Sequence, residues 1–288
     1  MASILTTVRD LDRLRQITVV LARHGFGEMI QRTGLGALLG GAKAASVPPL
    51  SLGVRIRLVL QELGPSFVKL GQIASTRPDL IPEEIVRELK KLQDEVPPVP
   101  FAELQPHIER ELGATLADIY SSFDETPIAS ASIAQVHRAT LKVGDDAVPV
   151  AVKIQRPNIQ KTIETDLDLL YLLAKAVERS MPESKSYAPT KLVEQFDRAI
   201  TAELDFMLEA DNARRFAENF STQPNVSFPL VYREASSRRV LTLEFFDGKK
   251  IHGAVEAGAS GEVIAKACVQ IFMKQIFEDG FFHADPHP

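Results

Sequence analysis

The stretch Val148-Pro149-Val150-Ala151-Val152-Lys153-Ile154 places one lysine inside an apolar, β-branched run. Such a run predicts a buried strand. Burying a lysine ammonium is costly unless an anionic group meets it. Two interpretations of Lys153 therefore stand: its side chain extends past the sheet edge into water, or it contacts an anion inside the fold. The rest of the chain has to decide between them.

Length and composition exclude several classes of protein. A chain of 288 residues has room for one large domain or two small ones. The net charge of −5, with both signs interspersed, and the absence of Trp argue against a nucleic-acid binder. The single cysteine, Cys268, excludes an internal disulfide, suits a reducing compartment and is expected in the core. No segment reaches the ~20 apolar residues of a membrane span, so we expect a cytoplasmic protein.

The first hundred residues read as helices. We expect helical structure over residues 4 to 42, with a break at Gly40-Gly41, and a second helix that ends at Gly64-Pro65. A third helix is expected to start at Pro65, and a fourth at Pro82, where two glutamates follow at the positive end of the helix dipole. The Pro-rich residues 96–100 form the clearest linker.

The pattern then changes to period two. Residues 123–128 and 134–141 read as strands, and a turn at residues 144–146 leads into the strand of Lys153, so that the last two strands form a hairpin. Helices are expected over two further segments, 158–180 and 190–219, the second with Thr190 as its N-cap. Two strands, near residues 230–232 and 240–245, and a buried apolar helix over 260–279 complete the chain.

Several separated motifs resemble one family, the UbiB/ADCK atypical kinases. Lys69-Leu70-Gly71-Gln72 looks like the K-x-G-Q signature of that family, and Glu203-Leu204-Asp205 looks like its E-x-D motif. The Ala-rich run Ala129-Ser130-Ala131-Ser132-Ile133-Ala134-Gln135 resembles its nucleotide loop, and Asp285, in His-Ala-Asp-Pro-His-Pro, sits where the family has its H-x-D catalytic loop. Motifs in this order over residues ~50 to 288 are far more specific than one motif alone.

The resemblance implies a site. Lys153 would be the lysine that grips nucleotide phosphates, paired with Glu209 of a helix, and Asp285 would orient a hydroxyl or water. Small residues in the 129–135 loop would let backbone N–H groups approach the phosphates. Adenine would bond to a hinge at Glu244, Phe245 and Phe246. ATP and Mg²⁺ are the implied ligands, with no metal ligand expected within this chain.

A lid is also implied. Glu203 interrupts an apolar helix stripe, so an ionised carboxylate there needs a cation, and Lys69 is the expected partner of Glu203 or Asp205. Gly71 would let the lid approach another backbone closely, and Gln72 would supply polar groups. Such a lid would cover the nucleotide site and favour ATPase or small-molecule chemistry over phosphorylation of other proteins.

Simpler interpretations remain open for each motif. The Ala-rich loop can be a tight hairpin, the hinge only an edge strand, and Lys69 a solvated residue between two docked helices. The alternation of His283, Asp285 and His287 suggests a metal site. We favour the catalytic-loop interpretation, because it accounts for the same residues.

The expected fold is α+β, a protein-kinase-like N-lobe. The expected domains are a helical extension (1–100), the lobe with a helical insertion (101–247) and the start of a C-lobe (248–288). The implied function is an atypical kinase or ATPase that supports ubiquinone, or other isoprenoid-quinone, biosynthesis. The alternative is a non-catalytic scaffold that binds nucleotide or lipid. Lipid, a quinone precursor and biosynthetic proteins are candidate partners, and peripheral membrane contact is left open.

The sequence contains no Asp-Phe-Gly, and it stops before the Asn that the family uses for Mg²⁺. We therefore expect a truncated chain that is catalytically inactive.

Overall fold

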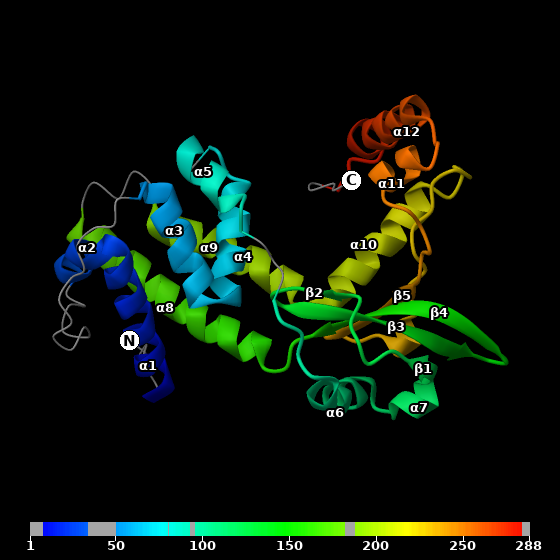
Figure 1. The fold of residues 1–288 in the computed structure, drawn as a ribbon, viewed down its shortest axis with the longest axis horizontal. Helices are drawn as coiled ribbons and strands as arrows, with labels where there is room; N and C mark the ends of the chain where they lie inside the picture. Colours follow the sequence, from blue (N-terminus) through cyan, green and yellow to red (C-terminus); the bar gives the residue numbers. More distant parts are fainter. Residues whose placement is uncertain (1–7, 34–49, 80, 93–95, 182–187, 284–288) are drawn as a thin grey trace.

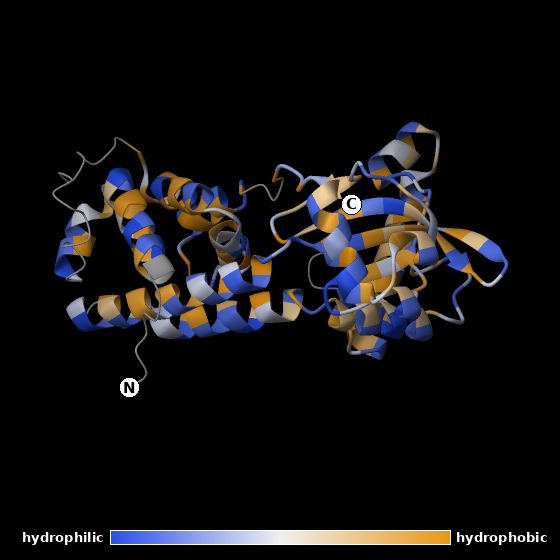
Figure 2. Ribbon diagram, turned by 90° about the horizontal axis from the view of Figure 1, so that it is seen from below, coloured by the Kyte–Doolittle hydropathy of each residue, from blue (hydrophilic) through white to orange (hydrophobic). Residues whose placement is uncertain are grey.

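The computed structural model describes residues 8–33, 50–79, 81–92, 96–181 and 188–283, with side chains from residue 11 onward. Figures 1 and 2 show two masses side by side, a group of helices and a twisted sheet with its own helices. The expected α+β class is confirmed. The expected division into 1–100, 101–247 and 248–288 remains a prediction.

The helical extension is built from short amphipathic helices. They are α1 (Val8–Leu21), a π-helical turn η1 (Ala22–Phe26), α2 (Gly27–Arg32), α3 (Leu52–Leu63), α4 (Pro65–Ser75) and α5 (Glu83–Leu89). The expected helical structure over 4–42 is confirmed for residues 8–32, with an additional break that the sequence did not predict. Gly25, at φ 85°, and His24 form this break, and residues 34–42 lie outside the described ranges.

Two long helices join the extension to the sheet. They are α8 (Ile159–Ser180) and α9 (Pro189–Glu203), which lie against each other and against α4. Leu169 of α8 belongs to the same apolar core as Leu60, Leu63 and Phe67 of α3 and α4. A buried ion pair adds to this contact, because Arg13 of α1 reaches Asp166 of α8 at 2.7 Å.

The sheet has the strand order β1-β3-β4-β5, with β2 also paired to β3, and all its pairs are antiparallel. The strands are β1 (Tyr120–Phe123), β2 (Ala129–Ser130), β3 (Ala134–Val143), β4 (Asp146–Gln155) and β5 (Val240–Glu244). The expected β3–β4 hairpin is confirmed, with Gly144 at φ 61° in its turn.

Two strand predictions need correction. The expected strand over 123–128 is instead β1, which ends at Phe123, and β2, which starts at Ala129. Between the two strands, the Asp124 carbonyl oxygen accepts a hydrogen bond from the ring of the buried His137. Residues 230–232 form only one bridge, Val231 to Leu243, and lead into the 3-10 turn η4 (Arg233–Ala235).

Helices cover both faces of the sheet. On one face, α6 (Phe101–Leu112) and the short α7 (Leu116–Ile119) pack against Val150, Val152 and Ile154 of β4. On the other face, α10 (Phe206–Asn219) and the ends of α8 and α9 form a core with Leu241 of β5.

The expected single helix over 190–219 is also wrong. It breaks at Leu204-Asp205 into α9 and α10. Thr190 is not the N-cap, because the helix already starts at Pro189, a residue favoured in a first turn, and the Thr190 N–H donates to Glu178.

The last helical segment is exposed rather than buried. It consists of α11 (Ile251–Glu256), α12 (Gly261–Met273) and the π-helical turn η5 (Lys274–Glu278). Val263 is 66% exposed and Phe277 73%, while Cys268 is half-buried, so the predictions of a buried helix and a core cysteine are wrong. Apolar composition alone does not bury a helix, and no described element covers this outer face.

Candidate active site

Lys153 lies near the centre of the sheet and contacts an anion. Along β4, Val152 and Ile154 point to the α6 face, so Lys153 points to the α10 face, opposite Leu241 of β5. Its Nζ lies 2.6 Å from Glu209 Oε2 and 4.8 Å from the centre of the Phe206 ring. The lysine therefore pairs with a carboxylate of the facing helix and does not merely extend into water.

Glu209 reaches Lys153 because α10 starts where it does. Asp205 is the N-cap of α10, and its Oδ1 accepts a hydrogen bond from the Met207 N–H at 3.0 Å. Glu209 then falls in the first turn, where the positive end of the helix dipole favours a carboxylate.

The α9–α10 break separates the two glutamates and gives each its own lysine. Glu203 is the last residue of α9, and its Oε1 lies 3.0 Å from the Nζ of Lys69 on α4. Asp205, the other expected partner of Lys69, pairs with Arg238 at 2.8 Å. The second oxygen of Glu203 is buried and has no hydrogen-bond partner among the described residues.

The Ala-rich loop is a tight, braced turn between β2 and β3. The Ala131 N–H donates to the Ala134 carbonyl at 2.8 Å. Arg156, just after β4, donates to the Ala131 carbonyl and to Ser130 Oγ, each at 2.8 Å. Ser132 and Ile133 are buried, and Ala129 is exposed. Sequence reasoning missed Arg156, whose only signal was its position directly after the strand of Lys153.

Gln135 has a different environment from the one expected. It is 1% exposed, its Oε1 accepts from the Val99 N–H at 2.8 Å, and its Nε2 lies 2.9 Å from Nε2 of His137. Its amide therefore fastens the linker before α6 to the sheet and is not available to a nucleotide.

Gly71 and Gln72 do not face the cleft either. A Cβ added to Gly71 would lie 2.3 Å from Leu92 Cδ1 and 2.7 Å from Leu60 Cδ1. Gln72 Nε2 lies 3.5 Å from the Leu92 carbonyl oxygen. The close approach expected at Gly71 is thus to leucine side chains rather than to backbone, and of the three signature residues only Lys69 reaches the acids.

Two backbone N–H groups of the expected hinge already donate hydrogen bonds within the protein. The Glu244 N–H donates to the Leu230 carbonyl at 2.8 Å, and the Phe245 N–H donates to the Pro149 carbonyl at 3.1 Å. The Phe245 ring lies under the guanidinium of Arg138, 4.6 Å from its centre, and Phe246 is 48% exposed. Adenine would have to use the carbonyl groups here or the Phe246 N–H.

A cleft of about 820 Å³ adjoins the acids. Glu203, Asp205, Glu209 and Phe281 are among its lining residues. The Phe281 ring packs against Phe216 at an angle of 38°, with centroids 4.6 Å apart, and contacts Arg215. His283 is exposed at the end of the described chain, while Asp285 and His287 lie outside the described residues. Sequence reasoning did not single out Phe281.

The described residues contain neither a cluster of metal-ligating side chains nor a helix able to span a membrane. No group of three or more His, Cys, Asp or Glu side chains is placed to hold a metal ion in that part of the chain. No helix there combines the length and the apolar character needed to cross a membrane.

Known proteins resemble this chain over most of its length. The ABC1 atypical kinase-like domain matches residues 91–288. The probable protein kinase UbiB of Marinobacter nauticus is 43% identical over 84% of this chain and 44% of that protein. The probable protein kinase UbiB of Aeromonas salmonicida is 38% identical over 98% of this chain and 53% of that protein. The chain therefore spans about half the length of these relatives.

A solved structure supports the fold. Rv3197 of Mycobacterium tuberculosis, determined in complex with erythromycin, superposes with a TM-score of 0.55 and is 31% identical. The match covers 80% of this chain and 57% of that one. The resemblance to the UbiB/ADCK kinases is thereby confirmed, and the chain belongs to the ABC1 atypical kinase-like family.

Proposed function

We propose that this chain binds an adenine nucleotide between the 129–134 loop, Lys153 and the Glu244–Phe246 segment. We further propose that the whole protein is an atypical kinase or ATPase that supports ubiquinone, or other isoprenoid-quinone, biosynthesis. The observation that carries the proposal is the Lys153–Glu209 pair, 2.6 Å across the sheet–helix boundary. Among kinases such a pair orients the lysine that contacts nucleotide phosphates.

Each residue has a part in this proposal. Glu209 holds the ammonium of Lys153 in place, and Phe206 lies beneath that group at 4.8 Å. The braced turn would present its backbone N–H groups to phosphate oxygens, and alanine makes it stiffer than a glycine loop. Mg²⁺, when bound with ATP, neutralises phosphate charge. Asp285, outside the described residues, would orient the acceptor hydroxyl or a water.

Lys69 would act as the lid residue. Its pairing with Glu203 brings α4 of the extension to the cleft that Glu203 and Glu209 line. A helix in that position would obstruct a protein substrate. The proposal therefore favours ATPase or small-molecule chemistry.

Calorimetric titration with ATP tests the nucleotide site. Lys153→Ala removes one charge-assisted phosphate contact, so the binding free energy should weaken by about 1.5–3 kcal/mol, roughly 10- to 150-fold. Lys175→Ala, at an exposed position of α8, is the control and should bind like the parent chain. Equal affinity in the parent chain and Lys153→Ala would reject the site.

Turnover separates the kinase or ATPase proposal from a binding scaffold. Metal-dependent ATP hydrolysis by the whole protein, stimulated by lipid, is expected if the protein is catalytic. Nucleotide binding without any turnover would support the scaffold.

A further inference from the structure

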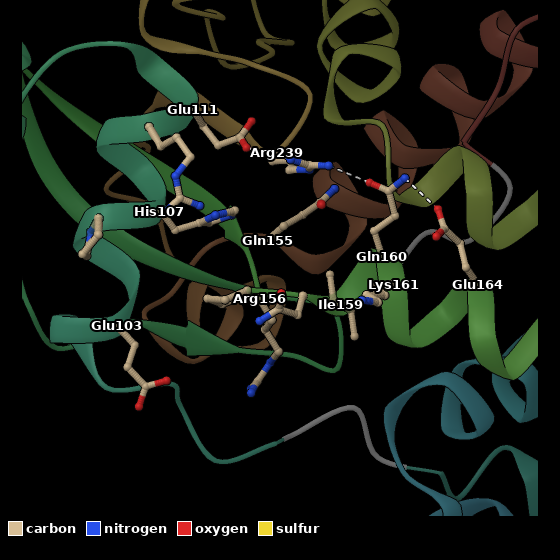
Figure 3. A pocket seen from close by; sticks show the side chains of 14 residues that line it. Glu103, His107, Glu111, Gln155, Arg156, Ile159, Gln160, Lys161, Glu164 and Arg239 are labelled. Carbon is tan, nitrogen blue, oxygen red and sulfur yellow. Dashed lines mark hydrogen bonds and ion pairs between the residues drawn. The ribbon is translucent and has the colours of Figure 1, made fainter. Parts of the chain in front are cut away.

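A second cavity, of about 590 Å³, lies between α6, the end of β4 and the first turn of α8. Figure 3 shows side chains from these three elements converging on it. It shares no lining residue with the cleft beside Glu203 and Glu209. Its volume is in the range of small-molecule sites.

One wall is the N-terminus of a long helix. α8 has 22 residues, its N-cap Asn158 makes no side-chain capping bond, and its first turn contains no acid. The first turn of a helix leaves N–H groups without helical acceptors and carries a partial positive charge. Ile159, Gln160 and Lys161 of this turn line the cavity. The positive charge of Lys161 therefore adds to the partial positive charge of the helix N-terminus.

The opposite wall carries an unsatisfied histidine. His107 of α6 is only 9% exposed, and its Nε2 is buried with no hydrogen-bond partner among the described residues. Figure 3 shows His107 on the α6 wall, across the cavity from Lys161. Burial lowers the pKa of His107, with Glu111 acting in the other direction, so the ring is neutral near pH 7. A buried polar atom without a partner is rare unless a ligand or water meets it.

Two cationic side chains at the cavity, Arg110 and Lys161, are available to bind an anion. Arg239 connects the two walls, donating to Glu111 on α6 and to Gln160 on α8, each at 2.8 Å. This pairing neutralises Glu111. Glu164 accepts from Gln160 at 2.9 Å. Arg110 and Lys161 are exposed and line the cavity. Glu103, near the start of α6, is also exposed and lines it.

We propose that this cavity is an anion site that binds the phosphate group of a small molecule. The Ile159 N–H donates to the Arg156 carbonyl. The N–H groups of Gln160 and Lys161 and the side chains of Lys161 and Arg110 bind the phosphate oxygens, and His107 donates from Nε2. The site is separate from the nucleotide cleft and does not depend on the proposed kinase activity. The substrate class is a phosphomonoester, free in solution or at the head of a lipid.

The test is a titration of the full 288-residue chain carrying Lys153→Ala, so that the nucleotide cleft contributes least. Glycerol phosphate is the soluble probe. Its binding is measured by calorimetry and by the imidazole NMR signals of His107. We expect saturable binding and a saturable shift of those signals. Arg110→Glu together with Lys161→Glu should weaken binding at least about tenfold. Both residues are exposed, so the fold tolerates these changes better than a change at His107.

Lys175→Glu provides the matched control, because it reverses an exposed charge on the same helix outside the cavity. It should leave affinity within about twofold, the range of a distant surface charge. Equal losses in Lys175→Glu and in the double variant would overturn the proposal, as would absence of any His107 shift.

A second arm identifies the source of the phosphate. Phosphatidylcholine vesicles with and without phosphatidic acid, a lipid whose head is a phosphomonoester, are tested with the same variants. Binding of glycerol phosphate assigns a soluble ligand. Binding only of the phosphatidic acid vesicles, lost in the double variant, assigns a lipid headgroup. Binding of neither probe would reject the site.

Discussion

The helical extension and the proposed nucleotide site are stabilised by different kinds of interaction. In the extension, α4 lies so close to α3 and to the residues that follow α5 that a methyl group on Gly71 would meet Leu60 and Leu92. At the cleft, by contrast, the fixed points are polar, Lys153 with Glu209 and Lys69 with Glu203, and each pair is partly exposed. Close apolar packing accounts for stability, whereas partly solvated pairs contribute little to it and leave groups for a ligand. Substitutions in the two regions should therefore have separable effects.

The largest expected loss of stability is in the core that joins the two regions. Ile200 is 0% exposed and packs with Phe196, Phe206 and Leu241. Ile200→Ala should lower the free energy of unfolding by about 2–5 kcal/mol, because it leaves a cavity. Urea unfolding followed by circular dichroism measures this. Val263→Ala, at a residue 66% exposed on α12, is the control and should change stability by no more than about 0.5 kcal/mol. Similar small losses in both would contradict the assigned core.

A smaller loss is expected at Gly71. Gly71→Ala gains about 1 kcal/mol of helix propensity but overpacks against Leu60 and Leu92, which costs about 1–3 kcal/mol. The net expectation is a loss of about 1 kcal/mol in the same unfolding assay. Gly253→Ala in α11, where an added Cβ meets nothing within 4 Å, should be neutral or stabilising. The same sign of effect at both glycines would show that the close packing at Gly71 does not matter.

The polar network behind the Ala-rich loop predicts a pH dependence. His137 is fully buried and satisfied as a neutral ring, since its Nδ1–H donates to the Asp124 carbonyl at 2.7 Å while its Nε2 accepts from Gln135. Burial lowers the pKa of His137 below its usual 6.5. Its stabilising contribution is therefore fully present above pH ~6.5 and is lost as pH falls through the lower folded-state pKa.

His137→Gln should flatten the fall of stability with pH in that acidic range, although it also lowers stability at neutral pH. His252→Gln, at an exposed position, should leave the profile unchanged. Unfolding free energies measured from pH 7 downward decide the matter, and an unchanged profile in His137→Gln would refute this account.

Lys69 should have the smallest effect on stability and a disproportionate effect on function. Its pair with Glu203 is partly exposed, so Lys69→Ala should cost only about 0.2–1 kcal/mol. If α4 is a lid, the same change should alter nucleotide preference or self-phosphorylation in the whole protein. Lys191→Ala, exposed on the α9 helix that carries Glu203, is the matched control. A variant with unchanged nucleotide preference and unchanged self-phosphorylation would remove the lid from the account.

The sequence predicted contacts best where one charge had few ways to be satisfied. Lys153 in an apolar strand needed an anion, and the structure places Glu209 there, 56 residues further along the chain. Glu203 in an apolar stripe needed a cation and lies beside Lys69. The β3–β4 hairpin followed from alternation and a glycine turn. The cost of an unpaired buried charge predicted that Lys153 and Glu203 need partners, and strand periodicity predicted the hairpin. The identity of the partners, Glu209 and Lys69, came from the family resemblance.

The features that the sequence did not predict depend on contacts between residues that lie far apart in the chain. The 190–219 segment has a continuous helical pattern, yet one helix ends at Glu203 and Asp205 caps the next. Asp205 also pairs with Arg238, a contact between distant residues that the pattern does not reveal. Gln135 belongs to a loop-like motif, yet its buried amide exchanges hydrogen bonds with the N–H and carbonyl groups of Val99. Arg156 had no motif to mark it, although it braces the loop. The apolar α12 looked like a core helix because composition does not reveal what covers a surface.

A crystal structure with a non-hydrolysable ATP analogue tests the central claim most directly. The account predicts phosphate density beside Lys153 Nζ and the 129–134 turn, with the Lys153–Glu209 pair retained and adenine at the Glu244–Phe246 segment. Phosphate density that lies away from Lys153, or that appears only in the cavity between α6 and α8, would contradict the assignment of the nucleotide site.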